Sequence, residues 1–443
     1  MKNNYQKIQS LYDIVCSHFY LGNETFDIGD KRYDPVALFG ILNLILDGKE
    51  LIFGEYGSGK TSSSERISSL VKGLPLEFVQ STTLHGHPEQ TEEKMKGTLD
   101  LGALEREGRE VVKWKIIPYS PVVIIDEINR LPVGKQNMLL NEVDRNIWSY
   151  RGETLIFKPA KSFFATINYQ DAGTTKLISP ICDRFDLAVE TGAVHPIRKR
   201  FIRRGIDEEI LRDKKLSEEM VEYILKNNET RHAEKVSQYI KERSEEFKGE
   251  LERRLKEKGL DVLIPREEET REIKKEIAEI KISEDAELFL DYIGQEVYCQ
   301  YTLKKDFSRC HGCHYSNYLC ADLYSISNRA EQSLFRYSKA LAWFNSEEEV
   351  TLEHVLAVMP SALWHRSAVS GEKIGEVSEF EKDSSNELHA VNELLRSVKT
   401  RWEEHRDSQI EAYLAFREED YGKVRKMAEK TGHPFFKSLA KWL

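Results

Sequence analysis

The sequence contains no apolar run long enough to cross a bilayer. The longest run extends from Val36 to Leu46 and is interrupted by Asn43, whereas a membrane-spanning helix needs about 20 consecutive apolar residues. The N-terminus shows no secretory signal pattern and leads into an amphipathic helical pattern. These features predict a cytoplasmic protein with no membrane partner. The apolar run itself is expected to form a buried helix that packs on a sheet.

Basic residues are outnumbered by acidic ones. The chain of 443 residues has 65 Lys and Arg against 75 Asp and Glu, which gives a formal net charge of −10. This balance argues against a protein whose main task is to coat DNA or RNA, although it is compatible with a local basic surface. Hydrophobic residues make up 40% of the chain, enough for the cores of about two to three domains.

A glycine-rich loop at residues 54–61 has the sequence Gly-Glu-Tyr-Gly-Ser-Gly-Lys-Thr. It fits the phosphate-binding pattern G-x-x-x-x-G-K-[ST], and it stands between a strand candidate and a helical pattern. Lys60 would reach the β- and γ-phosphates of ATP, and Thr61 would bind Mg²⁺. The backbone of the loop, helped by the helix dipole, is expected to surround the phosphates at Gly54, Gly57, Ser58 and Gly59. A glycine turn that matches by chance is the alternative.

A second element with related chemistry follows at residues 122–127, Val-Val-Ile-Ile-Asp-Glu. Four β-branched residues suit a fully buried parallel strand. The strand delivers two carboxylates at its C-terminal end, where ligands bind in open α/β sheets. Asp126 is expected to hold Mg²⁺, directly or through water, and Glu127 to polarise the attacking water. An ordinary core strand with a solvated acidic end is the alternative, but the two elements together predict a P-loop ATPase.

Residues 49–200 alternate strand and helix patterns, which predicts an α/β core with a doubly wound parallel sheet. Residues 1–48 are expected to supply helices that lead into this core. Further strands are predicted at 76–79, 163–166 and 187–189, and one helix at 133–145. Two additions are predicted: a hairpin with one arm at 111–117, and a hairpin at 147–157 that turns at Arg151-Gly152.

Beyond residue 200 the sequence becomes helical and highly charged. Thirteen of the eighteen residues from Lys241 to Lys258 are charged, although apolar residues such as Phe247 and Leu251 fit one helix face. A projecting helical hairpin and two helices packed flat on the body explain this pattern equally well. We expect three helical regions: a charged insertion with the start of a lid at 201–298, the lid at 299–369, and a C-terminal region at 385–443.

Two polar residues follow the acidic strand and suit a nucleotide site. Asn168 ends the next predicted strand, where its side chain would contact the γ-phosphate or the lytic water; a simple turn residue is the alternative. Arg184 lies in Asp-Arg-Phe-Asp before the last strand. We expect it to reach the nucleotide of a neighbouring subunit, where a cation stabilises transition-state charge. The alternative for Arg184 is an ion pair with Asp183 or Asp186 of its own subunit.

Four of the six cysteines are clustered with the spacing C-x10-C-x2-C-x6-C: Cys299, Cys310, Cys313 and Cys320. In a cytoplasmic chain such clustering favours a metal over disulfides. Four thiolates would close a tetrahedral structural zinc site, with His311 or His314 as a substitute ligand. A [4Fe–4S] cluster is the alternative.

Taken together, these segments resemble the MoxR family of AAA+ ATPases. The most family-specific phrase is Asp-Glu-Ile-Asn-Arg at residues 126–130, and Tyr56 stands where the family usually has proline. Arg329, in Ser-Asn-Arg-Ala, matches the family's second sensor and would then contact the γ-phosphate. The likeness covers residues 35–190 well and 286–366 loosely. Its other carriers lie at 54–61, 165–168, 173–174 and 183–185.

The resemblance implies an AAA+ core with an all-helical lid and a homo-oligomeric ring, a hexamer. It also implies ATP-driven remodelling or chaperone-like maturation of a partner protein, with a von Willebrand A-domain protein as a candidate partner. Two other functions fit the sequence. One is a nucleic-acid-linked AAA+ motor or McrB-like NTPase subunit, with phosphate contacts from Lys94, Lys96, Lys113 and Lys115. The other is an ATP-dependent assembly switch.

Overall fold

The computed structural model describes residues 4–20, 25–157, 160–169, 175–192, 208–298, 318–323, 325–378, 385–431 and 433–441. The chain divides into two compact units, residues 1–278 and 279–443. Three clustered cysteines, Cys299, Cys310 and Cys313, lie outside the described residues, and so do His311, His314 and residues 173–174. The expectations for these positions therefore stay predictions.

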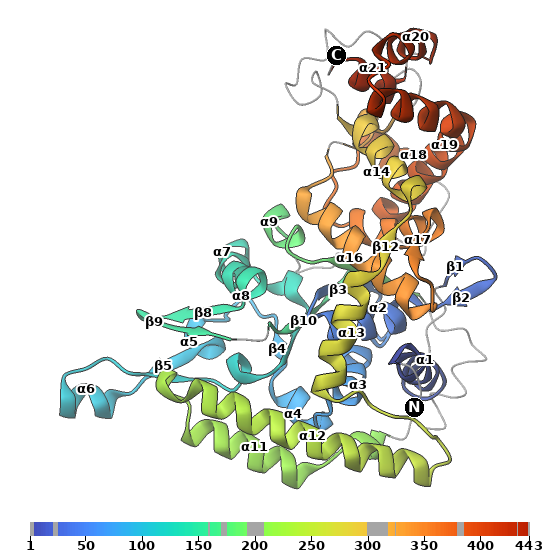
Figure 1. Cartoon of the computed structure of the whole chain (residues 1–443). Helices are drawn as coiled ribbons and strands as arrows, with labels where there is room; N and C mark the ends of the chain where they lie inside the picture. Colours follow the sequence, from blue (N-terminus) through green and yellow to red (C-terminus); the bar gives the residue numbers. More distant parts are fainter. Residues whose placement is uncertain are drawn as a thin grey trace. The chain divides into compact units, whose positions relative to one another are not determined.

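The first unit is built on a five-stranded parallel sheet (Figure 1), which confirms the predicted α/β core. The strand order is β11 (Leu187–Thr191), β3 (Lys49–Gly54), β10 (Ser162–Asn168), β7 (Val122–Asp126), β4 (Leu84–His85). Every residue of β10 is buried, as expected for a central strand covered on both faces. The register pairs Gly54 with Asn168 and Ile125 with Ala165. The C-terminal ends of β3, β10 and β7 therefore meet at one edge.

Helix α2 (Pro35–Leu46) is the buried helix expected from the apolar run. Asp34 caps its N-terminus by accepting a hydrogen bond from the N–H of Ala37. All residues from Val36 to Leu46 are buried, because α2 packs against α3 (Lys60–Lys72) and the sheet. The interrupting Asn43 is accommodated because its amide donates to the Phe163 carbonyl at 3.1 Å.

Two local predictions in this unit are wrong. Residues 76–79 form part of helix α4 (Leu76–Ser81) and not a strand. Pro75 directly precedes the helix with a φ of −53°, which prepares the chain for a helical turn, and a short apolar run does not distinguish the two structures. The helix expected at 133–145 is broken into α7 (Val133–Gln136) and α8 (Leu140–Arg145) by a 3₁₀ turn, η4 (Asn137–Leu139).

Both predicted hairpins are present. Strands β5 (Gly97–Leu99) and β6 (Val112–Trp114) pair antiparallel on either side of helix α6 (Leu101–Glu107), which lies away from the central sheet in Figure 1. Strands β8 (Ile147–Tyr150) and β9 (Glu153–Ile156) form the second hairpin. Its turn residues, Arg151 and Gly152, have φ values of 49° and 80°, the left-handed pair that a tight two-residue turn requires.

The charged helices of the first unit pack flat on its body. Helix α11 (Lys214–Lys226) contacts α4, and α12 (Ala233–Glu257) runs along α3. The Ser244 hydroxyl of α12 donates to the Lys72 carbonyl at 2.5 Å. A Cβ on Gly73 would approach Cγ of Lys248 to 2.3 Å, so the contact is close. Helix α13 (Glu267–Glu279) is tied to α1 (Asn4–Ile14) by an ion pair between Lys7 and Glu269.

The second unit is mostly helical. Its helices are α14 (Glu284–Val297), α16 (Asn328–Phe344), α17 (Leu352–Leu363), α18 (Gly371–Ser378), α19 (Asn386–Arg417), α20 (Tyr421–Thr431), α21 (Pro434–Lys441). A small parallel pair, β12 (Lys281–Ile282) with β13 (Glu349–Val350), corrects the expectation of an all-helical lid. The pairing of Lys281 with Glu349 and of Ile282 with Val350 joins the segments that lead into α14 and α17. No helix in the described ranges has the length and apolarity to cross a membrane.

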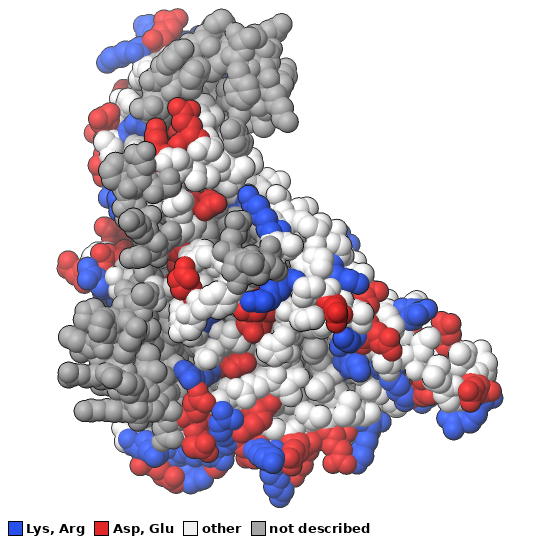
Figure 2. All heavy atoms as spheres, turned by 180° about the vertical axis from the view of Figure 1, so that it is seen from behind, with Lys and Arg blue, Asp and Glu red and all other residues white. Residues whose placement is uncertain are grey.

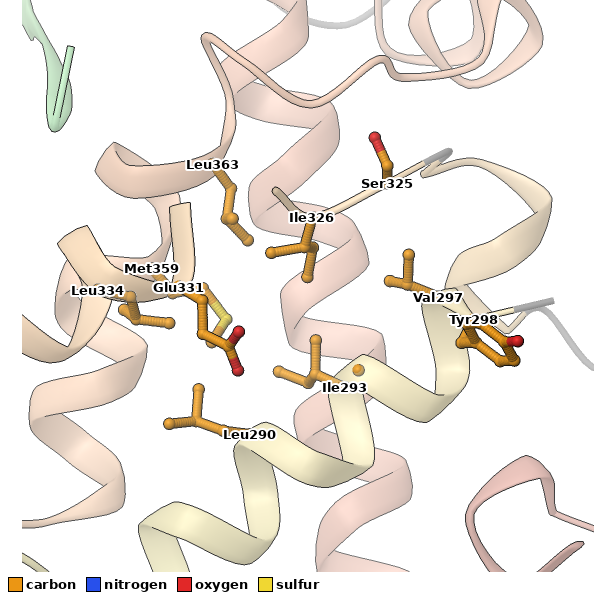
Figure 3. Close-up of a pocket in the computed structure, with 11 residues that line it drawn as sticks. Leu290, Ile293, Val297, Tyr298, Ser325, Ile326, Glu331, Leu334, Met359 and Leu363 are labelled. Atoms are coloured by element: carbon orange, nitrogen blue, oxygen red, sulfur yellow. The ribbon is translucent and has the colours of Figure 1, made fainter. Parts of the chain in front are cut away.

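A pocket of about 190 Å³ lies in the second unit among α14, α16 and α17 (Figure 3). Its walls are largely apolar, with Leu290, Ile293 and Met359 among them, and the Glu331 carboxylate points into it. None of the described residues that line it is Lys or Arg. An acidic, apolar pocket does not suit a triphosphate, so the pocket is not the nucleotide site.

A buried ion pair joins α14 to α19. Nε and Nη2 of Arg401 donate to the Glu296 carboxylate, at 2.8 and 2.6 Å, and the Glu296 side chain is fully buried. His433 contacts the same carboxylate at 3.1 Å. Burial alone would raise the pKa of Glu296, but Arg401 and then His433 lower it below its ordinary value. The ion pair therefore stabilises the contact between α14 and α19 only while both partners are present.

We expect Arg401→Ala to lower the free energy of unfolding by about 3–5 kcal/mol, because it leaves the Glu296 carboxylate buried without its cation. Urea denaturation measures the change. The control is Lys399→Ala on the same helix, whose partner Glu403 lies 3.7 Å away in an exposed pair, and which should cost less than about 1 kcal/mol. Equal losses for the two variants would contradict this prediction.

Candidate functional site

The glycine-rich loop joins β3 to α3 at the edge where the central strands end. A Cβ on Gly54 would lie 2.0 Å from Oγ1 of Thr191, so only glycine allows this approach of the loop to β11. Gly57 and Gly59 have φ values of 71° and 83°, in the region that favours glycine. The loop thus bends sharply before α3, whose first N–H groups have no intrahelical partner. This is the geometry of an anion-binding loop.

Lys60 begins α3 and folds back onto the loop. Its ammonium donates to the carbonyls of Gly54 and Glu55, at 2.9 and 2.8 Å. Burial lowers the pKa of Lys60 to about 8, while the charges of Asp126, Glu127 and Glu55 act in the opposite direction. The lysine is therefore positioned inside the bend, between the loop carbonyls and the acidic end of β7.

The Asp126 carboxylate accepts hydrogen bonds from hydroxyl groups on two other elements. The Thr61 hydroxyl on α3 and the Thr166 hydroxyl on β10 both donate to its Oδ1, the latter at 2.8 Å. Nδ1 of His85, on β4, lies 3.2 Å from its Oδ2. Hydroxyl and carboxylate oxygens are hard ligands, so Thr61 and Asp126 fit a magnesium ion. No sequence motif indicated Thr166 or His85 as site residues.

Glu127 is held in an unusual backbone conformation beside Asp126. Its φ is 51°, and its N–H donates to the Thr166 hydroxyl at 2.8 Å. A Cβ on Gly86, the residue after β4, would come within 2.1 Å of the Glu127 carbonyl oxygen, so the chain approaches Glu127 here as closely as glycine permits. The Asn168 amide donates to Oε1 of the Glu127 carboxylate. Asn168 and Glu127, predicted from separate motifs, thus lie in contact.

The second oxygen of the Glu127 carboxylate faces Arg130. Oε2 forms an ion pair with Nε of Arg130 at 2.5 Å. Nη2 of the same guanidinium donates to the Tyr56 hydroxyl, in the glycine-rich loop, at 3.2 Å. Arg130 was noted in the sequence only as part of a family phrase, because nothing in the spacing indicates where its side chain points.

Arg184 follows the short helix α9 (Ser179–Cys182). Its guanidinium donates to the Pro180 carbonyl at 2.5 Å and lies 3.6 Å from the carboxylate of Asp144. An ion pair within the subunit was expected, as the alternative, with Asp183 or Asp186. The observed pair involves Asp144, while Asp186 accepts a hydrogen bond from the Lys49 N–H at 3.0 Å.

Two families of known proteins match the chain, one in each compact unit. Residues 50–185 match the family model described as "AAA domain (dynein-related subfamily)", and residues 317–384 match the model described as "AAA lid domain". The protein is an AAA+ ATPase. No curated protein matches the chain.

A solved structure of a protein from Cytophaga hutchinsonii, named provisionally as an ATPase, resembles this AAA+ ATPase in fold. It has a TM-score of 0.55 and 18% sequence identity over 90% of this chain and 94% of its own. At this identity the likeness concerns the fold alone. The likeness includes residues of both compact units, because neither unit alone makes up 90% of the chain.

The lid unit of this AAA+ ATPase contains two of the predicted site residues. Arg329 is exposed in the first turn of α16, two residues after the capping residue Ser327. Cys320 is buried in the 3₁₀ turn η9 (Leu319–Ala321). Among the residues that the structure describes, no group of three or more His, Cys, Asp or Glu is arranged to hold a metal ion. The three other clustered cysteines fall outside that search.

We expect Thr166→Val to lower kcat for ATP hydrolysis about tenfold, and Thr166→Ser to retain most of it. Valine preserves the shape but removes the hydroxyl that positions Asp126 and Glu127, and an unpaired buried N–H costs about 1–3 kcal/mol. Steady-state phosphate release measures both variants. A serine variant as defective as the valine variant would show that the methyl group, and not the hydroxyl, is required.

Proposed function

We propose that this chain is a MoxR-like AAA+ ATPase that hydrolyses Mg-ATP in a ring assembly and uses the cycle to remodel or mature a partner protein. The single observation that carries the ATPase part is the contact network at the sheet edge. Lys60 and Thr61 begin α3, Asp126 ends β7 directly before Glu127, and Asn168 ends β10. Thr61 donates to Asp126, Asn168 donates to Glu127, and Lys60 donates to the glycine-rich loop. The packing of the core does not require polar groups at this place. The ammonium, the two carboxylates and the amide beside the glycine-rich loop therefore indicate a binding site.

The proposed roles follow from these positions. Lys60 exchanges the Gly54 and Glu55 carbonyls for phosphate oxygens, and Thr61 and Asp126 hold the magnesium ion. The ion would neutralise charge on the β- and γ-phosphates. Glu127 takes a proton from the attacking water, and Asn168 orients this carboxylate or the water. Gly54, Gly57, Ser58 and Gly59 supply the backbone that surrounds the phosphates.

Ring assembly accounts for Arg184. Its pair with Asp144 is mostly buried, with the Arg184 side chain 19% exposed, so the arginine is held in one place on the surface of the unit. We propose that it completes the nucleotide site of the next subunit in a homo-oligomer, a hexamer by resemblance. Arg329 of the lid is proposed to contact the γ-phosphate.

We infer that the client is a protein, with a von Willebrand A-domain protein as the candidate, and that the two hairpins contact it. Leu101 on α6 is 66% exposed and Ile156 on β9 is 65% exposed. Exposed large apolar residues on additions to a core are typical of surfaces that bind other proteins. A metal held by Cys299, Cys310, Cys313 and Cys320, structural zinc or alternatively a [4Fe–4S] cluster, remains a proposal from the cysteine spacing.

A nucleic-acid motor is less well supported. Lys96 is buried and pairs with Glu142 at 2.7 Å, and Lys113 pairs with Glu229 at 2.6 Å. These ion pairs occupy two of the four lysines that would have contacted phosphates. On the face in Figure 2, the described acidic and basic side chains are interspersed and form no continuous basic track. An assembly switch, in which turnover is incidental, stays open as a second candidate.

We expect Glu127→Gln to lower ATP turnover by a factor of about 10² or more, because a general base contributes that much, while ATP binding persists. Lys60→Ala should instead lose binding. Titration with a fluorescent ATP analogue and steady-state phosphate release separate the two effects. Glu89→Gln, which changes an exposed glutamate of the same unit, is the control. Normal turnover by Glu127→Gln would refute the assigned base.

Mixing two inactive variants tests the role of Arg184. Lys60→Ala subunits lack their own site but still donate Arg184, and Arg184→Ala subunits have the reverse defect. An equal mixture should recover roughly a quarter of wild-type turnover, since half the subunits keep Lys60 and half of their neighbours keep Arg184. A mixture no more active than its components would exclude a site shared between subunits.

A further inference from the structure

The pocket among α14, α16 and α17, here called the α14 pocket, exists partly because one helix position has no side chain. Leu290, Ile293, Gly294 and Val297 follow the i, i+3, i+4, i+7 spacing of one face of α14, and all four line the pocket. Three of them contribute apolar side chains, and Gly294 contributes none. A Cβ at Gly294 would meet nothing within 4 Å in the described part of the chain.

Glycine at this position is not explained by the packing of the helix. Gly294 lies in the interior of α14, where glycine destabilises a helix relative to alanine. Close approach of another segment usually accounts for such a glycine, but here the space beside it is open. The open space is therefore what Gly294 provides, and this space is part of the pocket.

The volume of the α14 pocket suits one large apolar side chain. It measures about 190 Å³, below the roughly 300 Å³ or more of sites that enclose a drug-sized molecule. An apolar cavity of about 150 Å³ holds a group the size of benzene. Leu334 and Met359 add apolar surface from α16 and α17, and the flexible thioether of a methionine adapts to the shape of a ligand. The pocket therefore favours a single aromatic or branched aliphatic group.

The charge at the α14 pocket is negative. The Glu331 carboxylate points into it (Figure 3), and none of the described lining residues is Lys or Arg. Desolvation raises the pKa of Asp291 on α14, and the charges of Glu287 and Glu331 raise it further, so negative charge accumulates beside the pocket. A cation next to the apolar group would complement this charge, and an acid would be repelled.

The α14 pocket is also open to solvent. Tyr298 at its edge is 64% exposed, and Glu331 is an exposed residue. A ligand would therefore place one group inside and leave the rest outside, as a side chain of a protein segment does.

We propose that the α14 pocket binds a segment of a partner protein in which one large apolar side chain stands next to an arginine or lysine. The apolar side chain fills the space beside Gly294, and the cation pairs with Glu331. All described residues of the pocket belong to the second unit, and none of them is a proposed ligand of ATP or magnesium. The inference therefore goes beyond the proposed function and does not rest on it.

The test titrates the full chain with short peptides and follows binding by saturation-transfer NMR. The probe is acetyl-Gly-Phe-Arg-Gly-amide. Two matched peptides replace its arginine by glutamate or its phenylalanine by alanine. The first probe should bind, and the glutamate peptide should bind at least about fivefold more weakly, the factor expected for loss of a partly exposed ion pair. The alanine peptide should show no binding, because it cannot fill the pocket.

Two variants separate the apolar and the charged contribution. Glu331→Gln should weaken binding of the arginine peptide about fivefold and reduce its advantage over the glutamate peptide. Gly294→Leu should abolish binding of both peptides and raise the midpoint of thermal unfolding, because leucine fills open space and is a better helix former than glycine. The control is Glu353→Gln, an exposed glutamate of α17 that is not among the described lining residues, and it should bind like the wild type.

Three outcomes would overturn the proposal. The first is equal binding of the arginine and glutamate peptides by the wild type, or no binding of either. The second is a lower unfolding midpoint for Gly294→Leu, which would identify the occupant as the chain itself, where residues 299–317 directly follow Tyr298 and lie outside the described residues. The third is a change in sedimentation coefficient on Gly294→Leu, which would identify a second copy of the chain.

The inference and the proposed function fail separately. Lys60→Ala, which should lose ATP binding, should bind the arginine peptide as the wild type does. A chain that hydrolyses ATP but ignores the peptide would reject the α14 pocket alone. A chain that binds the peptide without Lys60-dependent turnover would reject the ATPase proposal alone.

Discussion

The parallel pairing of β3, β10 and β7 is the constraint on which the whole site depends. Parallel strands end at the same edge, and the observed register brings Gly54, Asn168 and the end of β7 to the same level. One hydroxyl at this level, that of Thr166, accepts from the Glu127 N–H and donates to Asp126. A register shift of one residue would turn Thr166 and Asn168 to other faces of the sheet. The site would then lose its connection between the magnesium ligand and the base.

The sequence predicted the elements whose signals are local. The glycine loop, the β-branched strand with two acids and the tight turn at Arg151-Gly152 each carry their information within a few residues. The apolar run of α2 likewise predicted a buried helix. Where a local signal was ambiguous the prediction failed: residues 76–79 have the apolar content of a strand, but they follow Pro75 and form a helix.

The contacts that complete the site were not predictable, because they join residues far apart in the chain. Thr166 on β10 contacts Asp126 on the neighbouring strand β7, 40 positions away, and Arg130 contacts Tyr56, 74 positions away. The partner of Arg184 is Asp144 and not one of the neighbouring aspartates. In the same way, the charge density of α12 did not reveal whether it projects or packs. Its few apolar residues decide this by burying against α3.

The lysine and the acids of the site depend on one another electrostatically. Burial lowers the pKa of Lys60 to about 8, and Asp126, Glu127 and Glu55 keep it from falling further. With these acids in place the lysine stays mostly charged near neutral pH, as phosphate binding requires. The same acids would repel a triphosphate if they stood alone, and the lysine alone would lose its charge to burial. The lysine and the acids therefore stabilise each other's charged forms in a partly buried site. This is the electrostatic reason for the loop and the acidic strand to meet at one edge.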